Sequence, residues 1–167
     1  NRAFALHYQL KPTQCRQRGA AQGPARIRLS YRPPFDQQAM LDFWRQRAVP
    51  GLEWCEPQAT GGEAFTRIVT LDLPGGLCNG WVRLQFDAPA HQVRVQISDH
   101  FWPHLSTLLM RLRWALDLDA DPLSMEATLK TDFPNGGGIR VPGAWNGFEL
   151  AVRAVLGQQV SVAAART

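Results

Sequence analysis

Residues 64–97 read AFTRIVTLDLPGGLCNGWVRLQFDAPAHQVRVQI, and three strand-like segments alternate there with two turn clusters. The segments lie near residues 64–72, 80–86 and 92–97. The turns are PGG at 74–76 and DAP at 87–89. Connections this short join strands that run in opposite directions, because a parallel crossover needs a dozen or more residues. We therefore expect an antiparallel sheet at the centre of the chain.

Further elements flank this run on both sides. A fourth strand is expected near residues 52–56, and Ile27, Leu29 and Tyr31 alternate with polar residues as in a half-buried strand. Asp36 can cap a helix between these two strands. Leucines at helical spacing then predict a long helix that ends near residues 117–119; they are Leu105, Leu108, Leu109, Leu112 and Leu116. The order predicts an α+β fold with helices on one face of an antiparallel sheet.

The carboxyl-terminal part of the sequence has well-marked helix signals. Asn146 can cap a helix, and Glu149 can reach back to it as in a capping box. Gly157 is expected to stop this helix, and a second helix is expected to begin at residue 161. Gln158 and Gln159 would then occupy a tight turn between two helices, where free N–H groups and amides suit contact with a polyanion.

Composition and charge narrow the class of protein. The chain has 167 residues, of which 45% are hydrophobic and 19% charged, as expected for one ordinary globular domain plus appendages. It contains no apolar run of membrane-spanning length and no secretory signal, and its three cysteines are far apart. These features predict a cytoplasmic protein. Residues 1–35 carry seven basic residues and no acid, which is typical either of a nucleic-acid contact or of a solvated linker.

Several segments resemble a known family of DNA repair enzymes. They are YRPPFD (31–36), MLDFW (40–44), RAVP (47–50), GIRVPGAWNGF (138–148) and residues 151–165. Together they resemble the amino-terminal half of the AlkA-like DNA-3-methyladenine glycosylases, over about residues 26–167. The resemblance implies a TATA-binding-protein-like α+β domain over residues 26–119. It also implies that residues 120–167 begin an all-α helix-hairpin-helix domain.

The front of the chain resembles something different. Residues 1–16 are similar to the end of an AraC-type helix-turn-helix domain, and residues 17–25 have the composition of a linker. Together with the glycosylase likeness, this indicates a fusion of a regulator with a repair enzyme. A lone amphipathic helix is the alternative for residues 1–16.

The family resemblance implies roles for five residues. Gln159 lies where the family places an apolar wedge, usually leucine, that fills the gap left by a flipped base. Gln158 would reach the minor groove beside it. Phe43, Arg47 and Trp145 would line the pocket for the alkylated base, where a cationic purine stacks on an aromatic ring. Their alternatives are a core position for Phe43, a solvated one for Arg47, and packing at the start of the helix for Trp145.

The same comparison predicts what the chain lacks. The family carries a glycine-rich hairpin that grips a phosphate and an aspartate that stabilises the developing oxocarbenium ion. Neither is found by residue 167, so we expect no catalytic residue in this chain and no activity of the chain alone. His100 and His104 have a metal-binding spacing but no third ligand nearby, and we expect neither a metal nor another cofactor.

These observations favour a part of a monofunctional DNA glycosylase for base-excision repair. Its partner would be double-stranded DNA with alkylated purines such as 3-methyladenine, bound by a monomer. Two alternatives remain open. One is a non-catalytic DNA-binding module of a transcriptional regulator, and the other is a structural domain whose sheet binds a protein.

Overall fold

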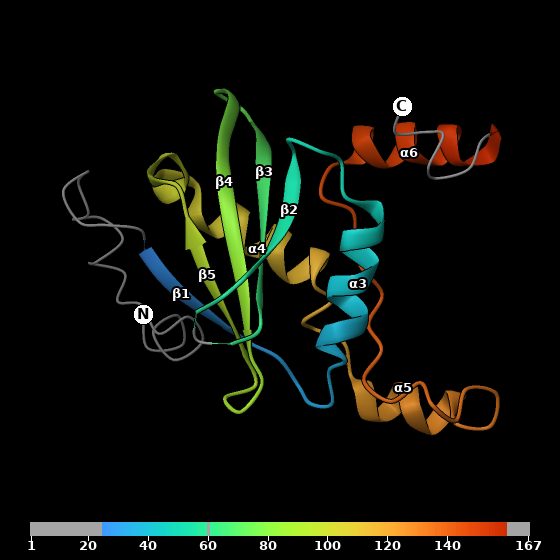
Figure 1. Cartoon of the computed structure of the whole chain (residues 1–167). Coiled ribbons are helices and arrows are strands. Elements are labelled where there is room, and N and C mark those ends of the chain that lie inside the picture. Colours follow the sequence, from blue (N-terminus) through green and yellow to red (C-terminus); the bar gives the residue numbers. More distant parts are fainter. Residues whose placement is uncertain (1–24, 60, 160–167) are drawn as a thin grey trace.

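The centre of the molecule is a five-stranded antiparallel sheet with the strand order β1-β5-β4-β3-β2 (Figure 1). It is seen in a computed structural model that describes residues 25–59 and 61–159. The strands are β1 (Ala25–Ser30), β2 (Glu53–Pro57), β3 (Glu63–Leu73), β4 (Gly76–Asp87) and β5 (Gln92–Ile97). The predicted antiparallel sheet is confirmed.

Four α-helices and one 3-10 helix accompany the sheet in the described part of the chain. They are α3 (Gln37–Arg47), the 3-10 helix η1 (Asp99–His104), α4 (Leu105–Ala115), α5 (Pro122–Leu129) and α6 (Gly147–Gln159). Helix α4 runs across the back of the sheet in Figure 1. None of these helices is both long enough and apolar enough to cross a bilayer.

The hydrophobic core lies between one face of the sheet and the helices α3 and α4. Alternate residues of each strand point inward, as the period of a half-buried strand requires. The fully buried inward residues include Ile27, Leu29, Phe65, Leu71, Val82, Leu84, Val93, Val95 and Ile97. They share one cluster with Leu108, Leu109 and Leu112 of α4 and with Met40, Leu41 and Trp44 of α3. The prediction that helices cover one face is therefore confirmed.

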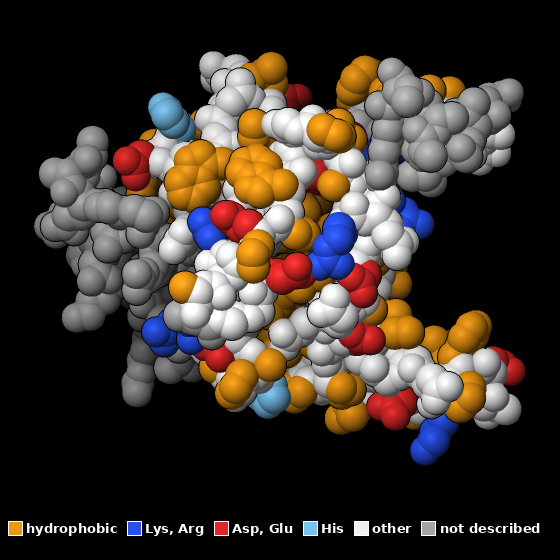
Figure 2. All heavy atoms as spheres, viewed as in Figure 1, with side chains coloured by type: hydrophobic (Ala, Val, Ile, Leu, Met, Phe, Trp, Pro, Cys, Tyr) orange, Lys and Arg blue, Asp and Glu red, His pale blue; other side chains and the backbone are white. Residues whose placement is uncertain are grey.

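The other face of the sheet has a mixed surface. Trp54 of β2 and Ile68 of β3 are 43% and 41% exposed on this side. Figure 2, which views the molecule from the strand side, shows apolar side chains over the upper part of the sheet, with acidic and basic side chains below them. The core therefore lies wholly behind the strands.

Hydrogen bonds made by Asp36 fix the start of α3. The Asp36 carboxylate accepts a hydrogen bond from the Ala39 N–H at 2.9 Å, so the predicted cap is confirmed. The Asp36 N–H donates to the Gly138 carbonyl at 2.7 Å. Gly138 has a φ of +79°, and a Cβ there would lie 2.9 Å from the Asp36 nitrogen. The absent side chain of Gly138 permits this close approach.

Removing the cap should destabilise the protein measurably. We expect Asp36→Ala to lower the free energy of unfolding by about 1 kcal/mol, because the Ala39 N–H loses its acceptor. Urea denaturation followed by circular dichroism measures the change. The control is Asp72→Ala, which removes an exposed carboxylate from β3. Equal unfolding midpoints for the two variants would contradict the capping role.

Candidate functional site

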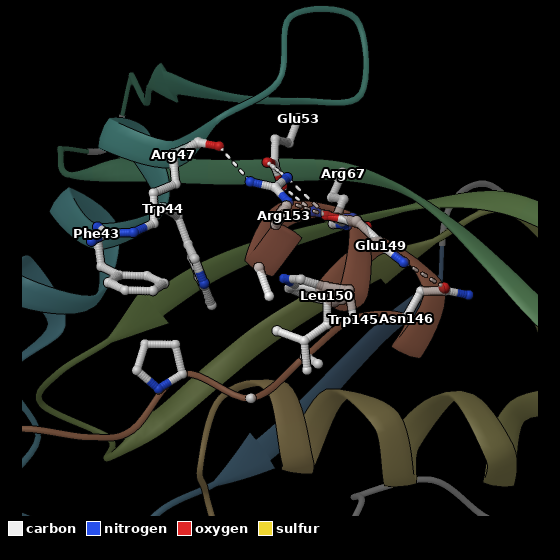
Figure 3. Close-up of a pocket in the computed structure, with 14 residues that line it drawn as sticks. Phe43, Trp44, Arg47, Glu53, Arg67, Trp145, Asn146, Glu149, Leu150 and Arg153 are labelled. Carbon is white, nitrogen blue, oxygen red and sulfur yellow. Dashed lines mark hydrogen bonds and ion pairs between the residues drawn. The ribbon is translucent and has the colours of Figure 1, made fainter. Parts of the chain in front are cut away.

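A pocket of about 290 Å³ opens where α3, the sheet and the start of α6 meet (Figure 3). Phe43 and Arg47 reach it from α3, and Trp145 reaches it from the segment before α6. The structure thus brings together three residues that are separated by up to 102 positions in the sequence. The family resemblance assigned all three to the pocket for the alkylated base, and that role stays a prediction.

Aromatic rings form one wall of this pocket. Trp44 is only 4% exposed, and its ring stacks on Phe65 with a centroid separation of 4.4 Å. The Trp145 ring lies 5.9 Å from Trp44 and is also buried. Trp145 therefore belongs both to the core and to the pocket wall. Phe43 is only partly buried, so part of its ring remains available on the pocket side.

Arg47 lies over the ring of Phe43. The guanidinium carbon is 4.1 Å from the ring centroid, a cation–π distance, although the side chain as a whole is exposed. Arg47 is therefore more than a solvated surface residue. The Phe43 ring therefore already binds a planar cation, the Arg47 guanidinium.

The pocket is also lined by a closed ring of four alternating charges, which we call the charge ring; its members are Arg67, Glu53, Arg153 and Glu149. Arg67 pairs with Glu53 and with Glu149, and Arg153 pairs with the same two carboxylates. The distances from Arg153 Nη2 are 2.8 Å to Glu53 and 2.7 Å to Glu149. Figure 3 shows these side chains converging from β2, β3 and α6. Each charged side chain of the ring is therefore paired with two side chains of opposite charge.

The sheet register explains how two charges of the ring come to be buried. Arg67 occupies the inward phase of β3 between Phe65 and Val69, and it lies directly opposite Glu53 of β2. Their side chains are 3% and 4% exposed. Sequence reasoning missed all four members of the ring. The available signal was an arginine in the inward phase of an apolar strand, because such a residue needs a buried acceptor.

Competing interactions set the pKa of Arg153. Burial lowers the pKa of this guanidinium, whereas the hydrogen bond to Glu53 and the charges of Glu149 and Glu53 raise it. The raising interactions outweigh burial, so the Arg153 pKa lies above its ordinary value. Arg153 is therefore a permanent cation in the ring.

The start of α6 is capped, but not by a capping box. Asn146 Oδ1 accepts from the N–H groups of Phe148 at 2.8 Å and Glu149 at 3.1 Å, which confirms the predicted cap. The Glu149 carboxylate bonds Arg67 and Arg153. The prediction that Glu149 folds back on Asn146 is therefore wrong, because two cations are stronger partners for a carboxylate than one backbone N–H.

Helix α6 also continues further than the sequence indicates. It runs through Gly157 to Gln159, so the predicted stop at Gly157 and the turn holding Gln158 and Gln159 are wrong. A helical glycine costs only about 1 kcal/mol relative to alanine, which the neighbouring helix formers offset. Gln158 is exposed, one turn beyond the pocket-lining Ala154 and roughly 6 Å from it along the axis. The second helix predicted from residue 161 lies outside the described residues.

The two histidines with metal-binding spacing both lie in the 3-10 helix η1. His100 is exposed and His104 is partly buried. Across residues 25–59 and 61–159, no three side chains of the His, Cys, Asp or Glu type are grouped to hold a metal ion.

The sheet with one covered face, and a pocket where that domain meets a following helix, define an α+β domain joined to a helical segment. Residues 26–146 match the sequence model of the AlkA N-terminal domain, and the chain belongs to this family. It is 38% identical over 170 residues to a Mycobacterium tuberculosis protein named "Probable bifunctional transcriptional activator/DNA repair enzyme AlkA". It is 30% identical over 137 residues to the Escherichia coli K12 protein "DNA-3-methyladenine glycosylase 2".

These alignments cover most of this chain but only part of each relative. They include 93% and 82% of this chain, and 32% and 45% of the mycobacterial and E. coli proteins respectively. The chain thus spans about a third to just under half of the curated relatives that it matches.

Proposed function

We propose that this chain is part of a monofunctional DNA glycosylase that acts in base-excision repair of alkylated DNA. The protein would flip out an alkylated purine such as 3-methyladenine and hydrolyse its N-glycosidic bond. The observation that carries the proposal is the pocket in which Phe43, Arg47 and Trp145 meet beside α6. The proposal is supported by the two relatives, one of which is named a DNA repair enzyme and the other a DNA-3-methyladenine glycosylase.

The pocket suits a flat, positively charged base. The Phe43 ring holds the Arg47 guanidinium at 4.1 Å, and a methylated purine, which is also a planar cation, would take the place of that guanidinium on the ring. Hydrolysis breaks the bond between C1′ and the base while the oxygen of a water molecule bonds C1′ and releases one proton to solvent. The base leaves as a neutral molecule because it begins with a positive charge. Binding and orientation are therefore the main tasks of the pocket.

We propose that the catalytic acid lies outside this chain. Two carboxylates line the pocket, those of Glu53 and Glu149, and each is paired with both Arg67 and Arg153. A carboxylate whose oxygens are engaged by two arginines is not free to stabilise an oxocarbenium ion.

The far end of α6 would contact the duplex. Gln158 would enter the minor groove, and Gln159 would fill the gap left by the flipped base and bond the orphaned partner base. Double-stranded DNA is thus the proposed partner, bound by a monomeric cytoplasmic protein without a cofactor. The proposed domains are the α+β domain over residues 26–119 and the beginning of the helical domain over residues 120–167.

A regulatory role of the complete protein is the second candidate. The mycobacterial relative is named a transcriptional activator as well as a repair enzyme. Its alignment covers 93% of this chain, which is more than residues 26–167 make up, so it extends into the residues before residue 26. Residues 1–16 would then end an AraC-type domain, followed by a linker over residues 17–25. Both segments lie almost wholly outside the described residues. DNA binding that is lost on deletion of residues 1–24, but is insensitive to Gln158 and Gln159, would favour a purely regulatory module.

The decisive experiment measures the release of methylated purines from alkylated duplex DNA. The 167-residue chain and the complete protein that contains it are assayed side by side. We expect release by the complete protein only. Activity in neither would remove the glycosylase proposal, and activity of the short chain would show that the catalytic acid lies within it.

Truncation of the aromatic wall should slow the reaction of the complete protein. We expect Phe43→Ala to lower kcat/KM for 3-methyladenine by about 2- to 30-fold, the equivalent of one cation–π contact. Single-turnover release from methylated DNA measures the change. Phe133→Ala, which removes a 64% exposed ring outside the pocket, is the matched control. Equal rates for both variants would contradict a role of Phe43 in base binding.

A further inference from the structure

The attachment of α6 to the rest of the molecule is unusual in its chemistry. The apolar side chains of this helix are exposed, with Phe148 at 79% and Val155 at 66%. Over residues 147–158, where side chains are described, only Glu149 and Arg153 are even partly buried. These two residues are the α6 members of the charge ring. Apolar packing within the described structure therefore does not orient α6.

The charge ring ties α6 to three other elements. Glu149 bonds Arg67 of β3, and Arg153 bonds Glu53 of β2. Arg153 Nη1 also donates to the Arg47 carbonyl at the end of α3, at 2.8 Å. Both anchors lie one turn apart on the same side of α6, because residues four apart face the same way. The helix is therefore held against rotation as well as translation.

The energetics of buried ion pairs indicate that the charge ring serves to orient α6. The cost of removing buried charges from water consumes much of their attraction, so apolar residues of similar volume often give equal stability. Planar guanidinium groups, however, accept only a narrow range of carboxylate positions. The ring thus fixes where α6 lies more strongly than it stabilises the fold.

We propose that the charge ring is a positioning device that sets α6 relative to the base pocket, with Glu149 and Arg153 as its positioning residues. This inference rests on the proposed function. Glu149 and Arg153 line the pocket as members of the charge ring, and the end of the same helix that is proposed to contact DNA begins one turn further on. A base bound in the pocket and Gln159, which is proposed to enter the duplex, would thereby be held at a fixed separation.

The test measures binding of the complete protein to a duplex with a stable abasic-site analogue and to the same duplex intact. We expect Glu149→Gln to weaken abasic-site binding by roughly fivefold or more, as is typical of a broken contact in a network, and to leave intact-duplex binding unchanged. Glu63→Gln is the matched control, because it breaks the Arg45–Glu63 pair between α3 and β3 without touching α6. Arg153→Lys is the second variant; it keeps the charge but loses the forked geometry.

A double-mutant cycle with Gln159→Ala separates positioning from general destabilisation. If the ring acts by placing the end of α6, Gln159→Ala should add less than about twofold in the Glu149→Gln background. Losses that multiply, a similar loss in Glu63→Gln, or wild-type binding by both ring variants would each overturn the proposal. If the wild-type protein does not prefer the abasic duplex, the proposed function falls and this inference falls with it. If that preference exists and survives in both ring variants, only this inference is wrong.

Discussion

Replacement of Arg67 by alanine should lower the free energy of unfolding by about 3–5 kcal/mol. The Arg67 side chain is 3% exposed and neutralises Glu53, which is equally buried, together with Glu149. Its removal leaves a buried carboxylate with only the Arg153 guanidinium, and the desolvation cost of that carboxylate is no longer compensated. Urea denaturation of the chain, followed by circular dichroism, measures the loss.

A surface pair supplies the control for this prediction. Arg94 pairs with Asp87 across β4 and β5, but its side chain is 53% exposed. Exposed pairs contribute about 0–1 kcal/mol, so Arg94→Ala should change stability by no more than that. If Arg67→Ala and Arg94→Ala lower the free energy of unfolding by equally small amounts, the ion pairs of the buried charge ring do not stabilise the protein as their geometry indicates.

Trp44→Ala should have a similarly large effect through a different mechanism. Trp44 is 4% exposed and stacks on Phe65, with Trp145 at 5.9 Å on another side. Loss of its ring opens a cavity between the sheet and the pocket wall, and truncation of a buried aromatic residue costs about 3–5 kcal/mol. The unfolding free energy in urea measures this cost.

Another tryptophan serves as the comparison. Trp114 of α4 is 70% exposed, and Trp114→Ala removes the same side chain from a position with little burial. Its cost should be well below that of Trp44→Ala, because far less apolar surface is lost from the core. Equal destabilisation by the two variants would show that Trp44 is not a central element of the core.

The sheet could be predicted because its signals are local. Alternating apolar residues and short turns placed β5 at its observed bounds and β2 within one residue. Strand β4 begins at Gly76, four residues before the prediction, since the hairpin pairing with β3 continues to Leu73 opposite Gly76. Residues 76–79 contain little apolar alternation, so only the pairing partner reveals that they form a strand.

The site was predictable only in part, for physical reasons that differ between its residues. Phe43, Arg47 and Trp145 came from the family resemblance, because no periodicity links α3 to a segment about a hundred residues away. The charge ring was missed because arginine and glutamate usually mark solvated positions, and burial of Arg67 depends on its register in the sheet. The helix stop at Gly157 failed because glycine weakens a helix without forbidding it.

Helix α3 is fastened at both ends by residues that follow the sheet domain in sequence. At its start the Asp36 N–H donates to the Gly138 carbonyl, and at its end the Arg47 carbonyl accepts from Arg153. Residues 138–153 therefore run along the whole length of α3 and are hydrogen-bonded to it at both ends. Because the Arg153 bond crosses residue 146, where the family match ends, we expect no hinge there. Force applied to the carboxyl-terminal segment would be transmitted directly into the α+β domain, and the two parts should move as one body.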